Sequence, residues 1–97
     1  MAIFGNPKYK AFMEDFKRSL KLQIIQSLNL QGMQPEEIDD AAPLFGDGLG
    51  LDSIDSLELI VLLERNYGIK IQDPREGRRV FESIDVMADY IQAHRTK

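Results

Sequence analysis

Two serines in the middle of the chain stand in a repeated pattern, and they are the side chains best suited to carry a covalently attached group. The motif Asp-Ser-aliphatic occurs twice in succession, first around Ser53 and again around Ser56. A serine hydroxyl is a place at which a modifying group can be attached. The neighbouring carboxylates have no obvious nucleophile, cofactor loop or metal partner, so an enzyme is the least favoured interpretation.

A helix is predicted to position both serines. It begins at Asp52 or Ser53 and runs to about Asn66, with Asp52 as its cap and Gly68 as its stop. On a helical wheel Ser56 falls on the core stripe, where its hydroxyl would be shielded. Ser53 falls at the helix start, beside a glycine-rich loop, where a large group could be attached without disturbing the packing. If one serine is modified, we therefore expect it to be Ser53.

The same wheel gives this helix two apolar faces. The residues predicted to point into the core are Ser56, Leu59, Ile60 and Leu63. A second aliphatic cluster lies well away from them, flanked by Glu58 and Glu64, and consists of Ile54, Leu57 and Val61. A helix in a small bundle buries only one face, so the second cluster is interpreted as a docking patch. The alternatives are ordinary scattered surface aliphatics, or a long loop that covers Leu57 or Val61.

The remaining pattern predicts a small all-α bundle. Apolar residues at intervals of three and four predict a first helix at about residues 8–30, and a single turn is expected from Pro35. A short helix is expected over residues 74–81, and Ser83 is predicted to cap the last helix. The buried stripe of that last helix consists of Ile84, Met87, Ala88 and Ile91. With a long loop between the first two main helices, the bundle has three main helices and one short one.

Length and composition favour one soluble domain over residues 1–97. A chain of 97 residues, of which 43% are hydrophobic and 29% charged, has room for a single core. We expect residues 1–7 to be a loose N-terminal extension and residues 93–97 a loose tail. The absence of cysteine and the single histidine argue against a metal site. No apolar run approaches a membrane span and no secretory signal opens the chain, so a cytoplasmic monomer is expected.

Acidic side chains are concentrated in the middle third of the chain. The net charge of −4 divides into +3 for residues 1–33, −8 for residues 34–66 and +1 for residues 67–97. Such an anionic region argues against nucleic acid as a ligand and for a basic protein partner. The alternative is a solvated acidic face that only aids solubility.

One stretch of the chain resembles the signature of the acyl carrier protein family. It reads Leu-Gly-Leu-Asp-Ser-Ile-Asp-Ser-Leu-Glu-Leu over residues 49–59. In that family an Asp-Ser-Leu motif after a leucine–glycine pair opens an acidic recognition helix. The resemblance continues through residues 61–71, where the helix ends and an alternating isoleucine loop follows. It extends upstream to residues 34–38 and downstream to residues 89–91, and so covers roughly residues 20–92.

The resemblance implies a carrier function. In the family the motif serine, here Ser53, forms a phosphodiester with 4′-phosphopantetheine taken from coenzyme A, and the thiol of this arm carries acyl groups as thioesters. The cofactor would thus supply the reactive group to a chain without cysteine. The resemblance assigns contact with basic partner enzymes to Asp52, Ile54, Asp55, Leu57, Glu58 and Val61. It assigns the sheltering of the acyl chain to Ser56, Leu59, Ile60 and Leu63.

The implied partners are a phosphopantetheinyl transferase and the acyl-transfer and condensing enzymes of fatty-acid, polyketide or related synthases. Four basic residues depart from the more acidic character that the family shows at their places: Arg65, Arg75, Arg78 and Arg79. They favour a dedicated carrier in a specialised pathway. Two alternatives remain open, namely a D-alanyl or aminoacyl carrier of the same fold, and a helical adaptor that binds a partner and is never modified.

Overall fold

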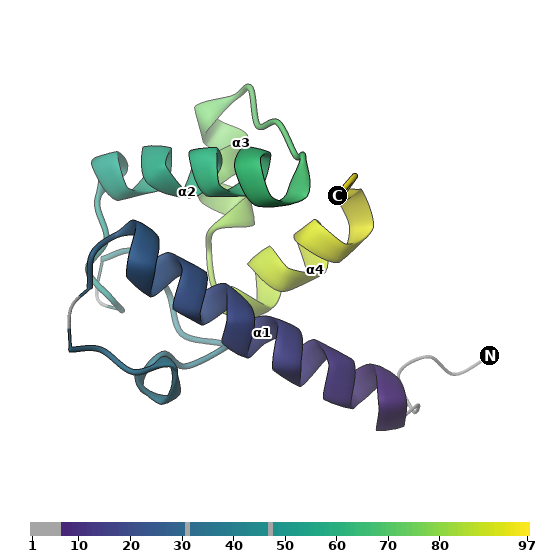
Figure 1. Ribbon diagram of the computed structural model, residues 1–97. Helices are drawn as coiled ribbons and strands as arrows, with labels where there is room; N and C mark the ends of the chain where they lie inside the picture. The colour runs from purple at the N-terminus through teal and green to yellow at the C-terminus, as the bar shows by residue number, and fades with distance from the viewer. Residues whose placement is uncertain (1–6, 31, 47) are drawn as a thin grey trace.

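The computed structural model describes residues 7–30, 32–46 and 48–97, which form helices joined by loops without a strand. The helices are α1 (Pro7–Ser27), α2 (Ser53–Tyr67), α3 (Pro74–Val80) and α4 (Ile84–His94), with a 3₁₀ turn, η1 (Pro35–Glu37), between α1 and α2. α1 packs against both α2 and α4, and α3 packs against the same two helices (Figure 1). None of the described helices is both long and apolar enough to cross a membrane. The predicted bundle of three main helices and one short one is confirmed.

The apolar stripes of the helices meet in one hydrophobic core. Its completely buried members include Leu20 and Ile24 of α1, Leu59 and Leu63 of α2, Phe81 after α3, and Ile84, Met87, Ala88 and Ile91 of α4. The last four are the stripe predicted for the final helix, and Ser83 caps that helix as expected. Burial of one large aliphatic side chain contributes about 1.5–3 kcal/mol, so this core holds α2 in place from its inner side.

The end of α2 depends on a glycine. Gly68 adopts a φ of +69°, and its N–H donates to the carbonyl oxygen of Glu64 at 3.1 Å. This left-handed conformation costs a glycine little, whereas a side chain at the position would also collide with that of Thr96. Gly68 is therefore the stop that the sequence predicted, and it fixes the length of α2.

The long loop between α1 and α2 is fastened to the start of α4 and the end of α3 by backbone hydrogen bonds. The N–H of Leu44 donates to the carbonyl of Glu82 at 3.1 Å, and the N–H of Asp85 donates to the carbonyl of Asp40 at 2.9 Å. Within the loop, the N–H of Leu51 donates to the carbonyl of Leu44 at 3.2 Å. Both leucines are buried, so the loop is a packed wall and not a free connection.

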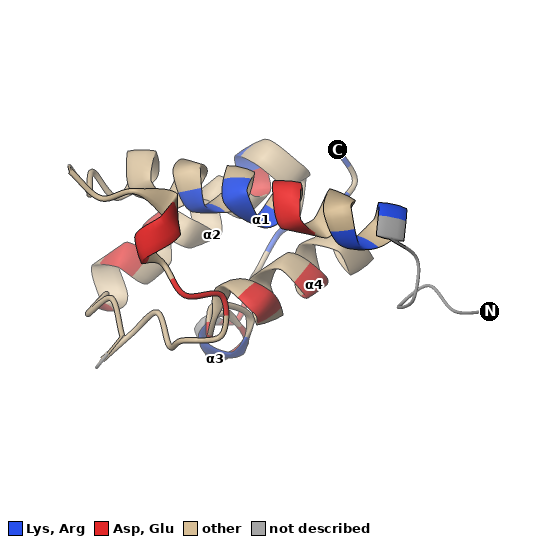
Figure 2. Cartoon of the chain, turned by 90° about the horizontal axis from the view of Figure 1, so that it is seen from below, with Lys and Arg blue, Asp and Glu red and all other residues tan. Residues whose placement is uncertain are grey.

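Basic residues of α1 hold η1 and the loop through ion pairs. Lys21 Nζ lies 2.6 Å from Asp40 Oδ1, and Arg18 pairs with Glu36 of η1. Figure 2 shows the acidic turn and loop beside the basic positions of α1. Two carboxylates of the anionic middle third are therefore paired within the molecule. Neither interpretation of that region, a surface for a basic partner or a solvating face, predicted these internal pairs.

At the C-terminus the structure differs from the expectation of a loose tail over residues 93–97. Residues 93–94 belong to α4, and beyond them the N–H of Thr96 donates to the carbonyl of Tyr67 at 2.9 Å. The tail therefore satisfies a carbonyl at the end of α2 that has no partner within the helix, and this bond holds the tail against α2. Of the expected N-terminal extension, Pro7 begins α1 and residues 1–6 lie outside the described residues.

Candidate functional site

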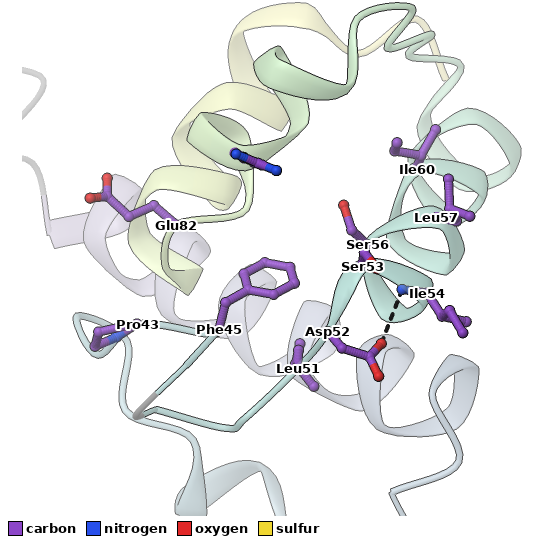
Figure 3. A pocket seen from close by; sticks show the side chains of 11 residues that line it. Pro43, Phe45, Leu51, Asp52, Ser53, Ile54, Ser56, Leu57, Ile60 and Glu82 are labelled. Atoms are coloured by element: carbon purple, nitrogen blue, oxygen red, sulfur yellow. Dashed lines mark hydrogen bonds between the residues drawn. The ribbon is translucent and has the colours of Figure 1, made fainter.

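Ser53 is the first residue of α2, and the residue before it caps the helix. Asp52 Oδ1 accepts hydrogen bonds from the N–H groups of Ile54 and Asp55, each at 3.0 Å, and Figure 3 shows the bond from Ile54. Asp55 Oδ2 accepts in return from the N–H of Asp52 at 3.0 Å. This reciprocal capping box stabilises the helix start by about 0.5–2 kcal/mol. It holds Ser53 at a fixed place on the surface, where the side chain is exposed.

An open pocket of about 580 Å³ lies beside Ser53 (Figure 3). It is bounded by the loop, the first two turns of α2 and the end of α3, through Pro43, Phe45, Leu51, Asp52, Ser53, Ile54, Ser56, Leu57, Ile60, Arg78 and Glu82. A mainly apolar pocket of this volume, with a few polar groups on its walls, is typical of sites for small molecules. Ser53 therefore stands at the edge of a space that can receive a small attached group.

The face of α2 that was predicted to point inward divides into two pairs. Leu59 and Leu63 are both 0% exposed, whereas Ser56 and Ile60 are half-buried and line the pocket. The prediction that the core shields Ser56 is therefore wrong, because the inner side of the first turns of α2 opens onto the pocket. Leu62 was left off the predicted stripe but is buried, since α2 is covered by both α1 and α3.

The opposite face of α2 is exposed. Ile54 is 68%, Leu57 61% and Val61 47% exposed, and the loop covers none of them. Ile54 and Leu57 also line the pocket, so the apolar outer face continues into it. The alternative that the loop buries Leu57 or Val61 is excluded, while the docking role of this face stays a prediction.

The acidic residues near Ser53 fall into two groups. The carboxylates of Asp52 and Asp55 are used in the capping box. Those of Glu58 and Glu64 are exposed and make no hydrogen bond or ion pair to the residues that the structure describes. Glu58 and Glu64 are thus the acidic side chains of α2 most available to a basic partner. The carboxylates of Asp52 and Asp55 are instead bonded to backbone N–H groups at the helix start.

Reasoning from sequence missed the loop side and the α3 side of the pocket. Phe45 forms a single bridge with Leu51, and the backbone of Gly48 lies so close to the carbonyl of Pro43 that no side chain would fit there. Apolar residues among glycines are a signal that such a loop packs inward. No comparable signal in the sequence places Arg78 at the pocket, since this depends on how α3 docks.

The chain matches the family model of the phosphopantetheine attachment site over residues 23–75, which include Ser53 and the whole of α2. Acyl carrier protein 2, mitochondrial, from Arabidopsis thaliana is 36% identical over 66 residues, covering 68% of this chain and 50% of the relative. The chain thus spans about half the length of the curated relative that it matches.

Proposed function

The chain belongs to the acyl carrier protein family, and on this premise we propose that Ser53 bears a 4′-phosphopantetheine arm and presents acyl groups to synthase enzymes. The observation that carries the proposal is the exposed position of Ser53 at the capped start of α2, on the edge of the pocket. In this role the chain is a carrier and not a catalyst, and its partners perform the chemistry.

The residues around Ser53 fit such an arm. Pantetheine combines methyl and methylene groups with two amides, and the pocket combines apolar walls with two hydroxyls, two carboxylates and a guanidinium. The phosphate would lie near the N-terminus of α2, where the helix dipole favours negative charge. When bound, the arm supplies the thiol on which acyl groups travel as thioesters.

Attachment of the arm forms one new bond, from Ser53 Oγ to phosphorus. This phosphorus is the one that bears pantetheine in coenzyme A, its bond to the rest of the nucleotide breaks, and adenosine 3′,5′-bisphosphate leaves. The hydroxyl proton must be removed, and we assign this to the transferase. On this chain, the capping box keeps Ser53 in place and the open rim of the pocket gives the transferase access.

The proposal is tested by incubating the purified chain with coenzyme A and a phosphopantetheinyl transferase of broad specificity. We expect the intact mass to increase by one phosphopantetheine group, with no second addition after longer incubation. An adaptor that is never modified would show no increase under conditions that load a known carrier completely, and that result would contradict the proposal.

Association with the transferase should depend on Glu58. Because this exposed carboxylate has no role in the cap, Glu58→Lys is expected to slow loading several-fold at low salt without changing stability. Asp89→Lys makes the same charge change on an exposed position of α4 and serves as the control. Loading rates are measured by mass at increasing salt, which should slow the wild type toward the variant. Equal, salt-independent rates for all three proteins would leave the acidic face with a solvating role only.

A further inference from the structure

One basic residue lines the pocket beside Ser53. Arg78, in the last turn of α3, is exposed and shares the pocket wall with Ser53. The other charged side chains on the wall are the carboxylates of Asp52 and Glu82. Within the described ranges, the guanidinium of Arg78 makes neither an ion pair nor a hydrogen bond. The pocket therefore contains a cation whose charge is not used by the fold.

A phosphate group on Ser53 would need this cation. It would add a negative charge to the residue that follows Asp52, on a pocket wall that also includes Glu82, and these like charges repel one another. The N-terminus of α2 offsets part of that repulsion, but the Asp52 carboxylate already occupies the N–H groups of Ile54 and Asp55. Arg78 is the remaining strong donor on the walls, and a guanidinium matches the oxygens of a phosphate with two parallel hydrogen bonds.

The packing of α3 against α2 brings Arg78 to the wall of the pocket that Ser53 also lines. Gly77 is buried, and a side-chain carbon added to it would lie 3.7 Å from Cδ1 of Ile60 in α2. The backbone of α3 at Gly77 therefore lies against Ile60, at a separation where a side-chain carbon would make an ordinary van der Waals contact. Arg78 follows directly in the sequence and faces the same space as Ile60.

We propose that Arg78 binds the phosphate of the arm attached to Ser53 and so holds the arm against the pocket between α2 and α3. This inference rests on the proposed function, because it requires the arm. Its consequence is a defined resting position: a partner enzyme that takes up the arm must first displace it from Arg78.

Arg79 provides the matched comparison. It lies in the same last turn of α3 and is exposed, but it does not line the pocket. A purely structural use of these arginines, which is to interact with the carbonyl end of the helix, would apply to both residues alike. Any difference between them that depends on the arm therefore reports on the phosphate.

The direct test is NMR of the wild-type protein with ¹⁵N-labelled arginine, before and after loading with coenzyme A and transferase. We expect the Nε–H resonance of Arg78 to shift on loading and that of Arg79 to stay in place. The ³¹P resonance of the loaded protein should move in Arg78→Gln and not in Arg79→Gln. An unmoved Arg78 resonance in fully loaded wild type would overturn the inference.

Thermal unfolding of the same proteins gives a second readout. We expect loading to raise the melting temperature of wild type more than that of Arg78→Gln, by about 2–4 °C at low salt, with Arg79→Gln behaving as wild type. Arg78→Lys should retain part of the difference. Equal shifts in all four proteins would contradict the inference alone, whereas a chain that gains no mass contradicts the proposed function and the inference with it.

Discussion

Leu63→Ala is expected to lower the free energy of unfolding by about 2–5 kcal/mol, whereas Leu57→Ala is expected to change it by about 0.5 kcal/mol or less. The two leucines lie six positions apart on α2, but Leu63 is 0% exposed and Leu57 is 61% exposed. Truncation of Leu63 removes packing contacts and leaves a cavity in the core, whereas truncation of Leu57 shortens a side chain that is mostly in contact with water.

The comparison is controlled, because both substitutions delete the same atoms from the same helix and change helix propensity equally. Urea unfolding followed by circular dichroism measures the stability, and a domain of this kind has only about 5–15 kcal/mol in total. Transferase loading measures the second consequence, since Leu57→Ala should weaken productive contact while the fold persists. If Leu57→Ala destabilised the protein as much as Leu63→Ala, the outer face of α2 would belong to the core and could not be a docking surface.

Ser53→Ala is expected to abolish loading, and Ser56→Ala to retain it. Ser53 is exposed at the first position of α2, whereas Ser56 is half-buried and lies about one turn further along the helix. Both serines line the pocket, so the preference for Ser53 rests on its access from outside. The helical wheel had instead suggested that Ser56 is shielded by burial in the core. The measurement is the intact mass after prolonged incubation with coenzyme A and transferase.

The free energy of unfolding of Ser53→Ala and Ser56→Ala must be measured alongside loading. Ser53 contributes no side-chain cap, because Asp52 has that role, so Ser53→Ala should stay within about 0.5 kcal/mol of wild type. Loss of loading in a folded variant then reports on the hydroxyl itself. Loading that survives Ser53→Ala but disappears in Ser56→Ala would show that the wrong serine has been assigned.

The helices could be predicted because each has a local signal strong enough to survive folding. The apolar stripe of α4, the cap at Asp52 and the glycine at position 68 can each be recognised from a few consecutive residues. The exposure of Ile54 and Leu57 could also be predicted. A helical wheel places them on the face opposite the core stripe, and a helix in a small bundle buries only one face. These features depend on neighbours in sequence.

The pocket could not be predicted, because its walls come from three separate segments. The loop is positioned by a hydrogen bond from the N–H of Leu44 to the carbonyl of Glu82, two residues far apart in the sequence, and α3 packs against α2. That arrangement places Ser56 at the pocket and brings Arg78 to the same space. The ion pairs of Glu36 and Asp40 with α1 were missed for the same reason, since charge counts along a sequence do not show which carboxylates meet a lysine or arginine.

The central claim is tested most directly by fragment-ion mass spectrometry of the chain isolated from its own cells. The peptide that contains both Ser53 and Ser56 should carry phosphopantetheine, with the fragment ions placing the group on Ser53 and the remaining mass identifying the acyl group. Complete absence of the group from this peptide in every preparation, or its placement on another residue, would contradict the account.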